Sequence, residues 1–426
     1  MEYSERYSIE SLSAGSAQDP HGRLFINNQG MTDLTDVDIV GASVDTVRQL
    51  FYGLPLPAMV EKLERHAENK DEIITLTDNP LSMKWHFTRM GKVARYRYKL
   101  QNNDEGLVVL FGSYFGKLDD EGQHLKVELS PHFISQRSVK KIWQRLHGEY
   151  AGLSRLFLSN PVPKGVAVHL ACDYQGFDLP SDFIQHFSTY SRTFRAYDGL
   201  AEIDLSDISE AIATYGGKHQ AKNYLIGKAA SVQMCLYDKS YEIKKSDKVD
   251  YFTREWGIYS LGTFDPDKVV RRVEARLHHQ IIREIGLGLG VELESFEQVE
   301  QYLTDIWRYA LERNRLMMDQ KILHPFWQLL MQDVYFYVPA KDLAICRKKK
   351  QAVDPIARNI SSVIGNLVSI YARQGLKTGT VMAQLKLLRC YPEIVRYYRS
   401  RGLNEDDLRQ TVERGLNLRR LVGKAA

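Results

Sequence analysis

Cysteine is scarce in this sequence, with four residues among 426. They form no C-x-x-C pair, and no histidine lies at a spacing that would complete a zinc site. A disulfide framework and a structural zinc domain are therefore not indicated. The four residues, far apart in the chain, are Cys172, Cys235, Cys346 and Cys390. This usage is typical of a protein in a reducing cytoplasm.

Long apolar runs are also missing. No stretch approaches the ~20 residues that a membrane-spanning helix needs. The N-terminus, MEYSERYSIESL, carries acidic residues where a signal peptide has a basic flank followed by an apolar segment. We therefore expect a soluble intracellular protein without a membrane partner.

Nucleotide-binding loops cannot be found either. The pattern G-x-x-x-x-G-K-[ST] is absent, and GLGLG at 286–290 follows a predicted helix instead of joining a strand to one. We expect GLGLG to be a loop that ends that helix. The motifs G-x-S-x-G and H-E-x-x-H are absent as well, so the sequence does not indicate a serine hydrolase or a zinc protease.

A strong net charge is lacking, since 57 Lys and Arg nearly balance 53 Asp and Glu to give +4. The balance hides an uneven distribution. Residues 341–426 hold 18 basic and 7 acidic residues, a net +11, which leaves −7 on the preceding 340 residues. This polarity indicates an anionic partner for the C-terminal end.

The pattern of elements predicts an α+β fold, a mainly antiparallel sheet with packed helices followed by a basic helical domain. Five strand-like segments lie between residues 72 and 130, and a helix is predicted over 130–153. A strand and a helix then follow at 165–174 and 179–194, so the sequence suggests two similar halves. Two more strands are predicted at 231–243 and 269–277.

Two helices are predicted after the last strand. The first, HHQIIREIG, ends at Gly286, and the second spans 295–318 with Ser295 and Gln298 as a capping box. With the length typical of two or three domains, we predict a polar N-terminal arm over 1–35, a catalytic domain over 36–340 and a DNA-binding domain over 341–426. Its candidate phosphate contacts are Arg347, Lys348, Lys349, Lys350, Arg396, Arg399 and Arg401.

Four predicted strands carry polar side chains on one face, because alternate residues of a strand point to opposite sides. Each strand alone has an ordinary explanation, a sheet with one solvated face. Together in one sheet they would gather carboxylates, an imidazole, cations and a tyrosine. The residues concerned are Lys126 and Glu128, His169 and Asp173, Tyr237 and Lys239, and Arg272, Glu274 and Arg276.

This combination is what metal-dependent phosphodiester transfer requires. A tyrosine hydroxyl, with an ordinary pKa of about 10, attacks a phosphate only when a cation or metal stabilises its oxyanion. Lys239, two residues beyond Tyr237 on the same predicted strand face, could do this, and Arg272 could clamp a phosphate oxygen. The candidate ligands for Mg²⁺ or Mn²⁺ are Glu128, His169, Asp173 and Glu274.

Alternatives stay open for each residue. Tyr241 is a second possible nucleophile in the spacing Y-x-x-x-Y, and His169 could be a hydrogen-bonded core histidine. Lys239 with Glu242, and Arg272 with Glu274, could be surface ion pairs worth under about 1 kcal/mol each.

Several of these segments resemble the replication initiation proteins of filamentous phages, the II/X family, and more distantly the rolling-circle initiators of small plasmids. LYDKSYEIKK at 236–245 resembles the family's Y-x-K-x-x-E strand, and VVRRVEARL at 269–277 its R-x-E-x-R-[LI] strand. KVELSPHFIS resembles the segment E-[IL]-x-x-S-P, and GVAVHLACDYQGF the strand R-x-D-x-x-x-D. The likeness covers roughly residues 100–310.

The resemblance implies a nicking and joining endonuclease with the fold of a rolling-circle initiator nuclease, acting in the cytoplasm of a bacterial host cell. It would cut one strand of double-stranded origin DNA, stay joined to the 5′ phosphate through a tyrosine, and later rejoin the displaced single strand. By position, Tyr237, Lys239 and Glu242 match the family's tyrosine, lysine and acid, and the match makes Glu242 a further candidate metal ligand. Arg272 and Glu274 match its R-x-E pair, and Asp173 matches the second acid of the middle strand.

One position departs from the family pattern, because His169 stands where the first Asp of the middle strand is common. The resemblance also implies a host polymerase, and the missing phosphate loop implies a separate host helicase. Two alternatives remain: a DNA-binding regulator without enzymatic activity, and a nuclease whose metal-activated water is the nucleophile. The sequence does not indicate the oligomeric state.

Overall fold

A computed structural model describes residues 24–27, 30–91, 94–135, 139–179, 183–191, 194–196, 223–228, 232–337, 340–348, 357–399 and 403–421. The chain divides into two compact units, one up to Lys348 and one from Lys349, where the predicted boundary was 340/341. Most of the predicted N-terminal arm lies outside the described residues. Its last part forms a hairpin of β1 (Leu24–Asn27) and β2 (Gly30–Asp33).

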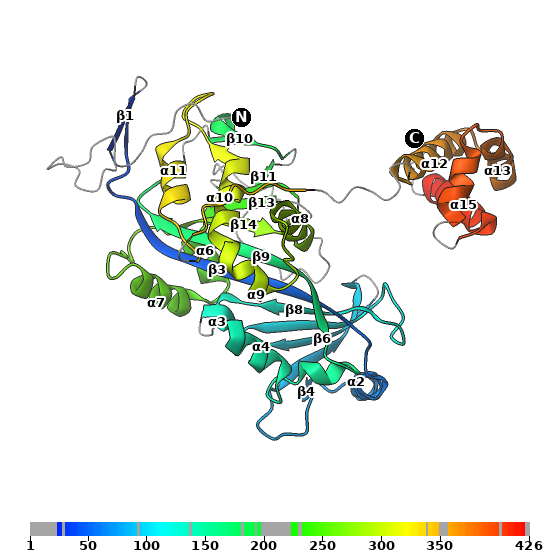
Figure 1. The fold of residues 1–426 in the computed structure, drawn as a ribbon, viewed down its shortest axis with the longest axis horizontal. Helices are drawn as coiled ribbons and strands as arrows, with labels where there is room; N and C mark the ends of the chain where they lie inside the picture. The colour runs from blue at the N-terminus through cyan, green and yellow to red at the C-terminus, as the bar shows by residue number, and fades with distance from the viewer. Residues whose placement is uncertain are drawn as a thin grey trace. The chain divides into compact units, whose positions relative to one another are not determined.

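The N-terminal unit is built on an eleven-stranded antiparallel sheet, which confirms the predicted α+β fold. Its strands are β3 (Asp38–Gly53), β4 (Ile73–Ile74), β5 (Trp85–Arg89), β6 (Tyr96–Asn102), β7 (Leu107–Ser113), β8 (Gly122–Leu129), β9 (Val162–Gln175), β11 (Phe194–Ala196), β12 (Tyr224–Ile226), β13 (Val232–Asp238) and β14 (Arg271–Leu277). Their order is β11-β12-β13-β14-β9-β3-β8-β7-β6-β5-β4. The long strands β3 and β9 run side by side through its middle (Figure 1).

The order reads similarly outward from this central pair. On one side β3 is followed by β8, β7 and β6, and on the other β9 is followed by β14, β13 and β12. The first half begins with the long strand β3, and its last strand, β8, pairs with β3. The second half begins with the long strand β9, and its last strand, β14, pairs with β9. The suggestion of two similar halves therefore has a counterpart in the topology.

Helices cover one face of the sheet and form the main core with it. They are α2 (Pro57–Asn69), α3 (Pro131–Ser135), α4 (Val139–His147), α5 (Phe183–His186), α8 (His279–Leu289), α9 (Phe296–Val299), α10 (Leu303–Arg313) and α11 (Pro325–Gln332). Their apolar residues pack against alternate strand residues such as Val127, Leu170, Met234 and Val273, all fully buried. The other alternate set, which carries the polar side chains, faces the opposite way.

Two helices pack on the opposite, polar face: α6 (Lys239–Lys245) and α7 (Val249–Tyr259). Ile243, Phe252 and Trp256 from these helices form a small separate core with Val40 and Val270. The remaining elements of the unit are short. They are η2 (Leu153–Leu156), η3 (Glu300–Tyr302), and the paired β10 (Phe187–Thr189) and β15 (Asn314–Leu316).

Several predicted element ends are wrong. The helix predicted over 130–153 ends at His147. The strand at 231–243 stops at Asp238, whose carboxylate accepts from the Tyr241 N–H and so begins α6. The helix predicted to end at Gly286 continues to Leu289, because the left-handed residue is Gly290, with φ of 74°. The helix predicted over 295–318 ends at Arg313, where the chain turns into β15.

One further prediction is wrong, and one is confirmed. Among the described residues of the predicted 179–194 helix, one short helix forms, α5, because Phe187–Thr189 pair with β15 instead. The predicted capping box of Ser295 and Gln298 is present at the start of α9.

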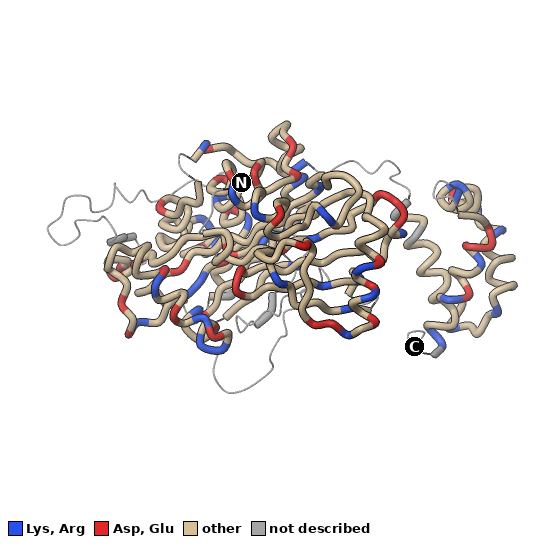
Figure 2. Tube along the Cα trace, turned by 90° about the horizontal axis from the view of Figure 1, so that it is seen from below, with Lys and Arg blue, Asp and Glu red and all other residues tan. Residues whose placement is uncertain are grey.

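The C-terminal unit is helical, as predicted. It consists of α12 (Ala357–Arg373), α13 (Thr378–Lys386), α14 (Tyr391–Arg399) and α15 (Glu405–Leu421). Its helices pack against one another around a core of their own, which includes Ile364, Val368, Val412 and Leu416. Charges of both signs lie along its helices (Figure 2). Across the described residues of both units, no helix combines the length and the apolar character needed to cross a bilayer.

Candidate functional site

The polar face of the sheet holds a buried cluster of ionisable side chains where β13, β14, β9 and β3 lie next to one another. The four strands named from the sequence, β8, β9, β13 and β14, all belong to this sheet, with β3 between β9 and β8. Arg272 and Glu274 are each 1% exposed, and Asp173 and His169 are 4% and 8% exposed. Charged groups so deeply buried need specific partners.

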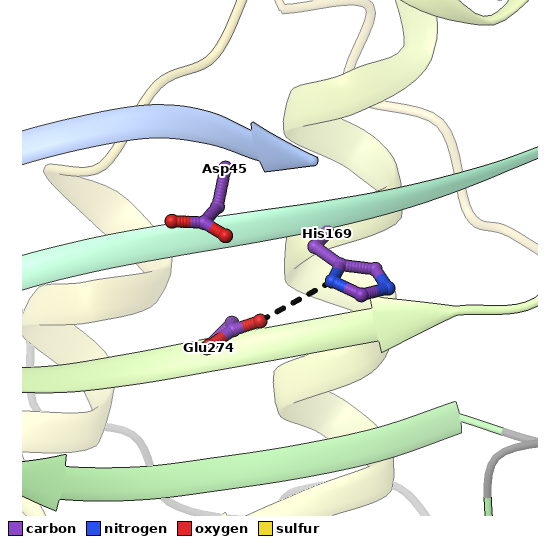
Figure 3. A group of neighbouring side chains, drawn as sticks. All are labelled: Asp45, His169 and Glu274. Carbon is purple, nitrogen blue, oxygen red and sulfur yellow. Dashed lines mark ion pairs between the residues drawn. The ribbon is translucent and has the colours of Figure 1, made fainter. Parts of the chain in front are cut away.

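Three of these side chains are arranged as a possible metal site: Asp45 from β3, His169 from β9 and Glu274 from β14 (Figure 3). One potential ligand atom from each lies within 4.8 Å of the other two. His169 Nδ1 is 3.4 Å from Glu274 Oε1. We call these residues the three-residue cluster. Two of its members, His169 and Glu274, were candidates from the sequence, whereas Asp45 was not.

A β-bulge places Asp45 in the cluster. Val44 is paired with Leu170 and Thr46 with His169, so Asp45 is an extra residue in the register between β3 and β9. Val44 and Val47 both pack against the helical core, and the two residues between them face the polar side. Strict alternation would put Asp45 on the same side as Val47. The sequence signal was the pair of polar residues between two valines, which breaks the period of two.

Neighbouring charges keep the cluster in the ionisation states that suit metal binding. Burial alone would raise the pKa of Glu274, but Arg276 and the hydrogen bond with His169 hold it well below its usual value. Asp45 is similar: burial raises its pKa, but Arg272, Lys239 and His169 together lower it, and the net shift is downward. Burial lowers the pKa of His169, which favours the neutral imidazole that coordinates metals.

Tyr237 lies beside this cluster and is joined to it. Its hydroxyl donates to Glu274 Oε2 at 3.0 Å, and its side chain is 5% exposed. In the antiparallel register Tyr237 is directly opposite Arg272. Tyr241, the second candidate nucleophile, is on α6 and 45% exposed, with Lys245 Nζ 4.7 Å from its ring centre. The fold therefore brings Tyr237 to the cluster.

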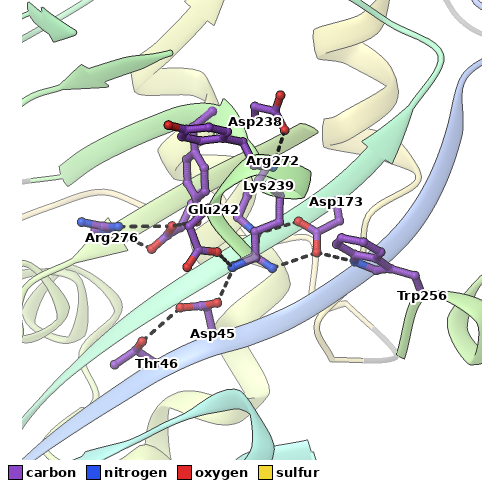
Figure 4. A network of polar contacts seen from close by, with 12 residues as sticks. Asp45, Thr46, Asp173, Asp238, Lys239, Glu242, Trp256, Arg272 and Arg276 are labelled. Atoms are coloured by element: carbon purple, nitrogen blue, oxygen red, sulfur yellow. Dashed lines mark hydrogen bonds and ion pairs between the residues drawn. The ribbon is translucent and has the colours of Figure 1, made fainter. Parts of the chain in front are cut away.

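Asp173 is engaged by Arg272 instead of lying in the three-residue cluster. Arg272 Nε and Nη2 donate to the two oxygens of Asp173 at 2.6 and 2.8 Å, and Trp256 Nε1 donates to Oδ2 at 2.8 Å (Figure 4). The same guanidinium reaches Asp45 through Nη1 at 2.5 Å. Arg272 thus links Asp173 to the cluster and fixes Asp45 in place.

Lys239 is the first residue of α6, so the prediction that it continues the strand face of Tyr237 is wrong. Its ammonium forms a buried ion pair with Glu242 and lies 4.1 Å from the ring centre of Phe252. The distance from Lys239 Nζ to the ring centre of Tyr237 is 6.0 Å. Burial lowers the pKa of Lys239, and the nearby Arg272 lowers it further. Lys239 and Glu242 therefore flank the cluster as a pair.

Glu128 is not part of this cluster. It lies on β8, the strand equivalent to β14 in the other half of the sheet, and its Oε1 is 3.1 Å from Lys126 Nζ and 3.3 Å from Arg48 Nε. Lys126 is 2% exposed, so this is a second buried ionic group on the same face. The structure thus keeps His169 and Glu274 together, pairs Asp173 with Arg272 and places Glu128 with Lys126.

The predicted DNA contacts also divide. Arg347 pairs with Glu284 of α8 at 2.7 Å, and the backbone N–H of Lys348 donates to the Glu284 carbonyl oxygen at 3.0 Å. Arg396 and Arg399 are exposed on α14. The remaining three candidates, Lys349, Lys350 and Arg401, lie outside the described residues.

Comparison with known proteins gives a phage context. No protein-family model matches the chain. Over 420 residues the chain is 27% identical to "Uncharacterized protein ORF430" of Pseudomonas phage Pf1, a filamentous phage, and the match covers 93% of this chain and 92% of that protein. The match therefore extends over parts of both units.

Proposed function

We propose that this protein is a replication initiation endonuclease that nicks one strand of double-stranded origin DNA through a tyrosine nucleophile. The observation that carries the proposal is the hydrogen bond from the Tyr237 hydroxyl to Glu274, a member of the three-residue cluster. A nucleophile next to a candidate metal ligand suits phosphoryl transfer by tyrosine. The likeness to an uncharacterized phage protein over nearly the whole chain supports the phage context of this proposal.

In the proposed nicking step, the Tyr237 oxygen attacks the phosphorus of the scissile phosphodiester. A bond forms between phosphorus and the tyrosine oxygen while the bond to the 3′ oxygen breaks. The phenolic proton, now donated in the hydrogen bond to Glu274, passes to solvent, and the departing 3′ oxygen takes up a proton from solvent. Arg272, opposite Tyr237 in the register, lowers the cost of negative charge on the phenol oxygen.

The products of this step explain how replication would begin and end. A 5′ phosphotyrosine holds the cut strand, and the free 3′ hydroxyl serves a host polymerase. A host helicase would separate the strands, since no phosphate loop for ATP exists in the sequence. Attack of a 3′ hydroxyl on the phosphotyrosine would rejoin the displaced single strand without a nucleotide cofactor, because the covalent link preserves the energy of the broken bond.

Asp45, His169 and Glu274 would hold the divalent cation. Two carboxylates and one imidazole suit Mn²⁺ better than Mg²⁺, because Mg²⁺ prefers oxygen ligands throughout. When bound, the ion would neutralise charge on the phosphate and the attacking oxygen. Arg276, which donates to Glu274 Oε1 at 2.7 Å, would orient that ligand.

The burial of the site has a mechanistic consequence. Tyr237 and Glu274 are 5% and 1% exposed, so a phosphate can reach the hydroxyl only after a neighbouring segment moves. DNA binding would supply the energy for this movement. The C-terminal unit belongs to the basic region 341–426. It would hold the duplex through phosphate contacts from residues such as Arg396 and Arg399.

One assay tests the proposal. The protein is incubated with supercoiled DNA carrying the phage origin and Mn²⁺ or Mg²⁺, and nicked circles and denaturant-resistant protein–DNA adducts are measured. We expect both products from the wild type, neither from Tyr237→Phe, and both from the matched control Tyr241→Phe.

The same assay separates the alternatives. Nicking without an adduct, retained in Tyr237→Phe, would show a nuclease that uses activated water. Origin binding with neither product would show a regulator without enzymatic activity. An adduct that is lost in Tyr241→Phe and retained in Tyr237→Phe would move the nucleophile to α6.

A further inference from the structure

A cavity of about 350 Å³ opens beside the site, and Asp173 lines it. Asp173 is the residue that Arg272 links to Asp45, so the cavity is one ion pair away from the three-residue cluster. Its volume lies within the range of small-molecule pockets. Unlike the cluster, it has no role in the proposed nicking step.

Seven of the eighteen residues that line it are aromatic. Phe252 and Trp256 come from α7, with ring centres 5.6 Å apart, and Phe296 and Phe336 line it as well. The Trp256 indole is held by its hydrogen bond to Asp173 (Figure 4). Rings fixed in this way offer flat faces against which another planar ring can stack.

The charged groups of the cavity are all carboxylates. Glu255 and Glu300 line it, and no Lys, Arg or His is among the described residues that do so. In the described part of the chain no side chain donates to the Glu300 carboxylate, and burial, together with Glu297, raises its pKa. A phosphate would find no cation here, whereas a ring carrying N–H donors would find carboxylates.

The third wall is a strand edge. β3 pairs with β8 only from Val47 onward. In the part of the chain that the structure describes, residues 38–46 of β3 therefore have a strand partner only on the side of β9. Gly41, Ala42, Ser43 and Val44 on this edge line the cavity. Backbone N–H and C=O groups at an open edge can hydrogen-bond the rim of a bound ring.

We propose that this cavity binds one unpaired guanine base of the DNA strand at the nick. Guanine is the base whose pairing edge presents two adjacent donors, N1–H and the N2 amino group, which one carboxylate can accept together. Adenine and cytosine place a ring acceptor beside their amino group, and thymine places its single N–H between two carbonyls. Stacking on the aromatic walls and acceptance by Glu300 together define the site.

This inference rests on the proposed function, because that function supplies the DNA strand to be bound. The test measures binding and needs no DNA cleavage. Binding of a single-stranded oligothymidine carrying one central guanine is measured by calorimetry in the absence of divalent cations. The same oligonucleotide with inosine, which lacks the N2 amino group, and with adenine serve as comparisons. We expect the guanine oligonucleotide to bind at least tenfold more tightly than the inosine or the adenine oligonucleotide. We expect dGMP alone to bind at least tenfold more weakly than the guanine oligonucleotide.

The variants locate the effect. Glu300→Gln should reduce the preference for guanine over inosine to less than threefold, while Glu297→Gln, an exposed residue nearby on α9, should retain it. Equal binding of the guanine and inosine oligonucleotides to the wild type would overturn the inference. Binding of dGMP as tight as that of the oligonucleotide would assign the cavity to a free nucleotide instead. Guanine preference in a protein that does not nick DNA would refute the proposed function and leave the guanine site standing.

Discussion

Tyr237 and Glu274 are joined across neighbouring strands by a hydrogen bond of 3.0 Å from the phenol hydroxyl to the carboxylate. In the register Tyr237 is opposite Arg272, and Glu274 is opposite Cys235, so the two residues are diagonal neighbours on the polar face. Both are almost completely buried. A tyrosine, a carboxylate and a guanidinium are thus fixed together by strand pairing alone.

Removing a member of the three-residue cluster should strongly weaken metal binding. We expect His169→Asn and Asp45→Asn each to weaken Mn²⁺ binding by at least about 100-fold, because each removes one of three protein ligands. Mn²⁺ titration followed by electron paramagnetic resonance measures the affinity, and circular dichroism checks the fold. The control Glu128→Gln changes the second ionic group and should leave Mn²⁺ affinity unchanged. Equal affinity in wild type and His169→Asn would rule out this site.

The pair of Arg272 and Asp173 should be important for stability. We expect Arg272→Met to lower the free energy of unfolding by about 3–5 kcal/mol, because it leaves the 4% exposed Asp173 without its bidentate partner. Urea denaturation measures the change. The control Arg155→Met breaks a surface pair with Glu149, both more than half exposed, and should have no measurable effect. A similar small effect at both positions would mean that the buried pair is not structural.

Two helical glycines should respond in opposite directions to replacement by alanine. A Cβ at Gly288 in α8 would meet the Cys346 carbonyl oxygen well inside contact distance, whereas nothing lies within 4 Å of a Cβ at Gly257 in α7. We expect Gly288→Ala to destabilise the protein by about 1–3 kcal/mol and Gly257→Ala to stabilise it by up to about 1 kcal/mol. Thermal unfolding compares the two. Stabilisation by Gly288→Ala would show that the 345–348 segment does not pack on α8.

His324 should make stability depend on pH. Burial, with His186 nearby, lowers the pKa of His324 to about 4, and its Nδ1 accepts from the Phe326 N–H at the start of α11. The unfolded chain binds the proton more readily, with a pKa of about 6.5, so the contribution is complete above that pH. It falls as the pH drops from about 6.5 to 4, by about 3 kcal/mol in all.

The variant His324→Asn isolates this term, because an Asn side chain can cap α11 without titrating. Denaturation of both proteins between pH 7 and pH 4 gives the difference in their free energies of unfolding. We expect the variant to lose less stability on acidification. Parallel pH profiles would show that His324 does not carry the dependence.

The C-terminal unit should govern DNA retention. A chain ending at Lys348 keeps the whole N-terminal unit, and the core of each unit is separate. We expect this truncation to weaken duplex binding and to flatten the plot of log affinity against log salt, since fewer phosphates are neutralised. Cleavage of a single-stranded origin oligonucleotide should persist. An unchanged salt slope would place the phosphate contacts in the N-terminal unit.

Alternation in the sequence determined which side of each strand carries the chemistry. His169 and Asp173 were separated from Val168, Leu170 and Cys172 by the period of two alone, and the structure buries the apolar set in the core. The basic C-terminal region and the capping box of Ser295 were equally visible, because both depend on residues close together in the chain.

Tertiary structure decided which polar residues meet. The order of strands put β3 beside β9, and a bulge turned Asp45 toward His169 and Glu274, against the period of two. In the same packing Asp173 forms an ion pair with Arg272, and Glu128 forms one with Lys126. Local sequence records the direction of a side chain because alternation is a property of one strand. It does not record the partner, because strand order and register are settled by the burial of the whole sheet.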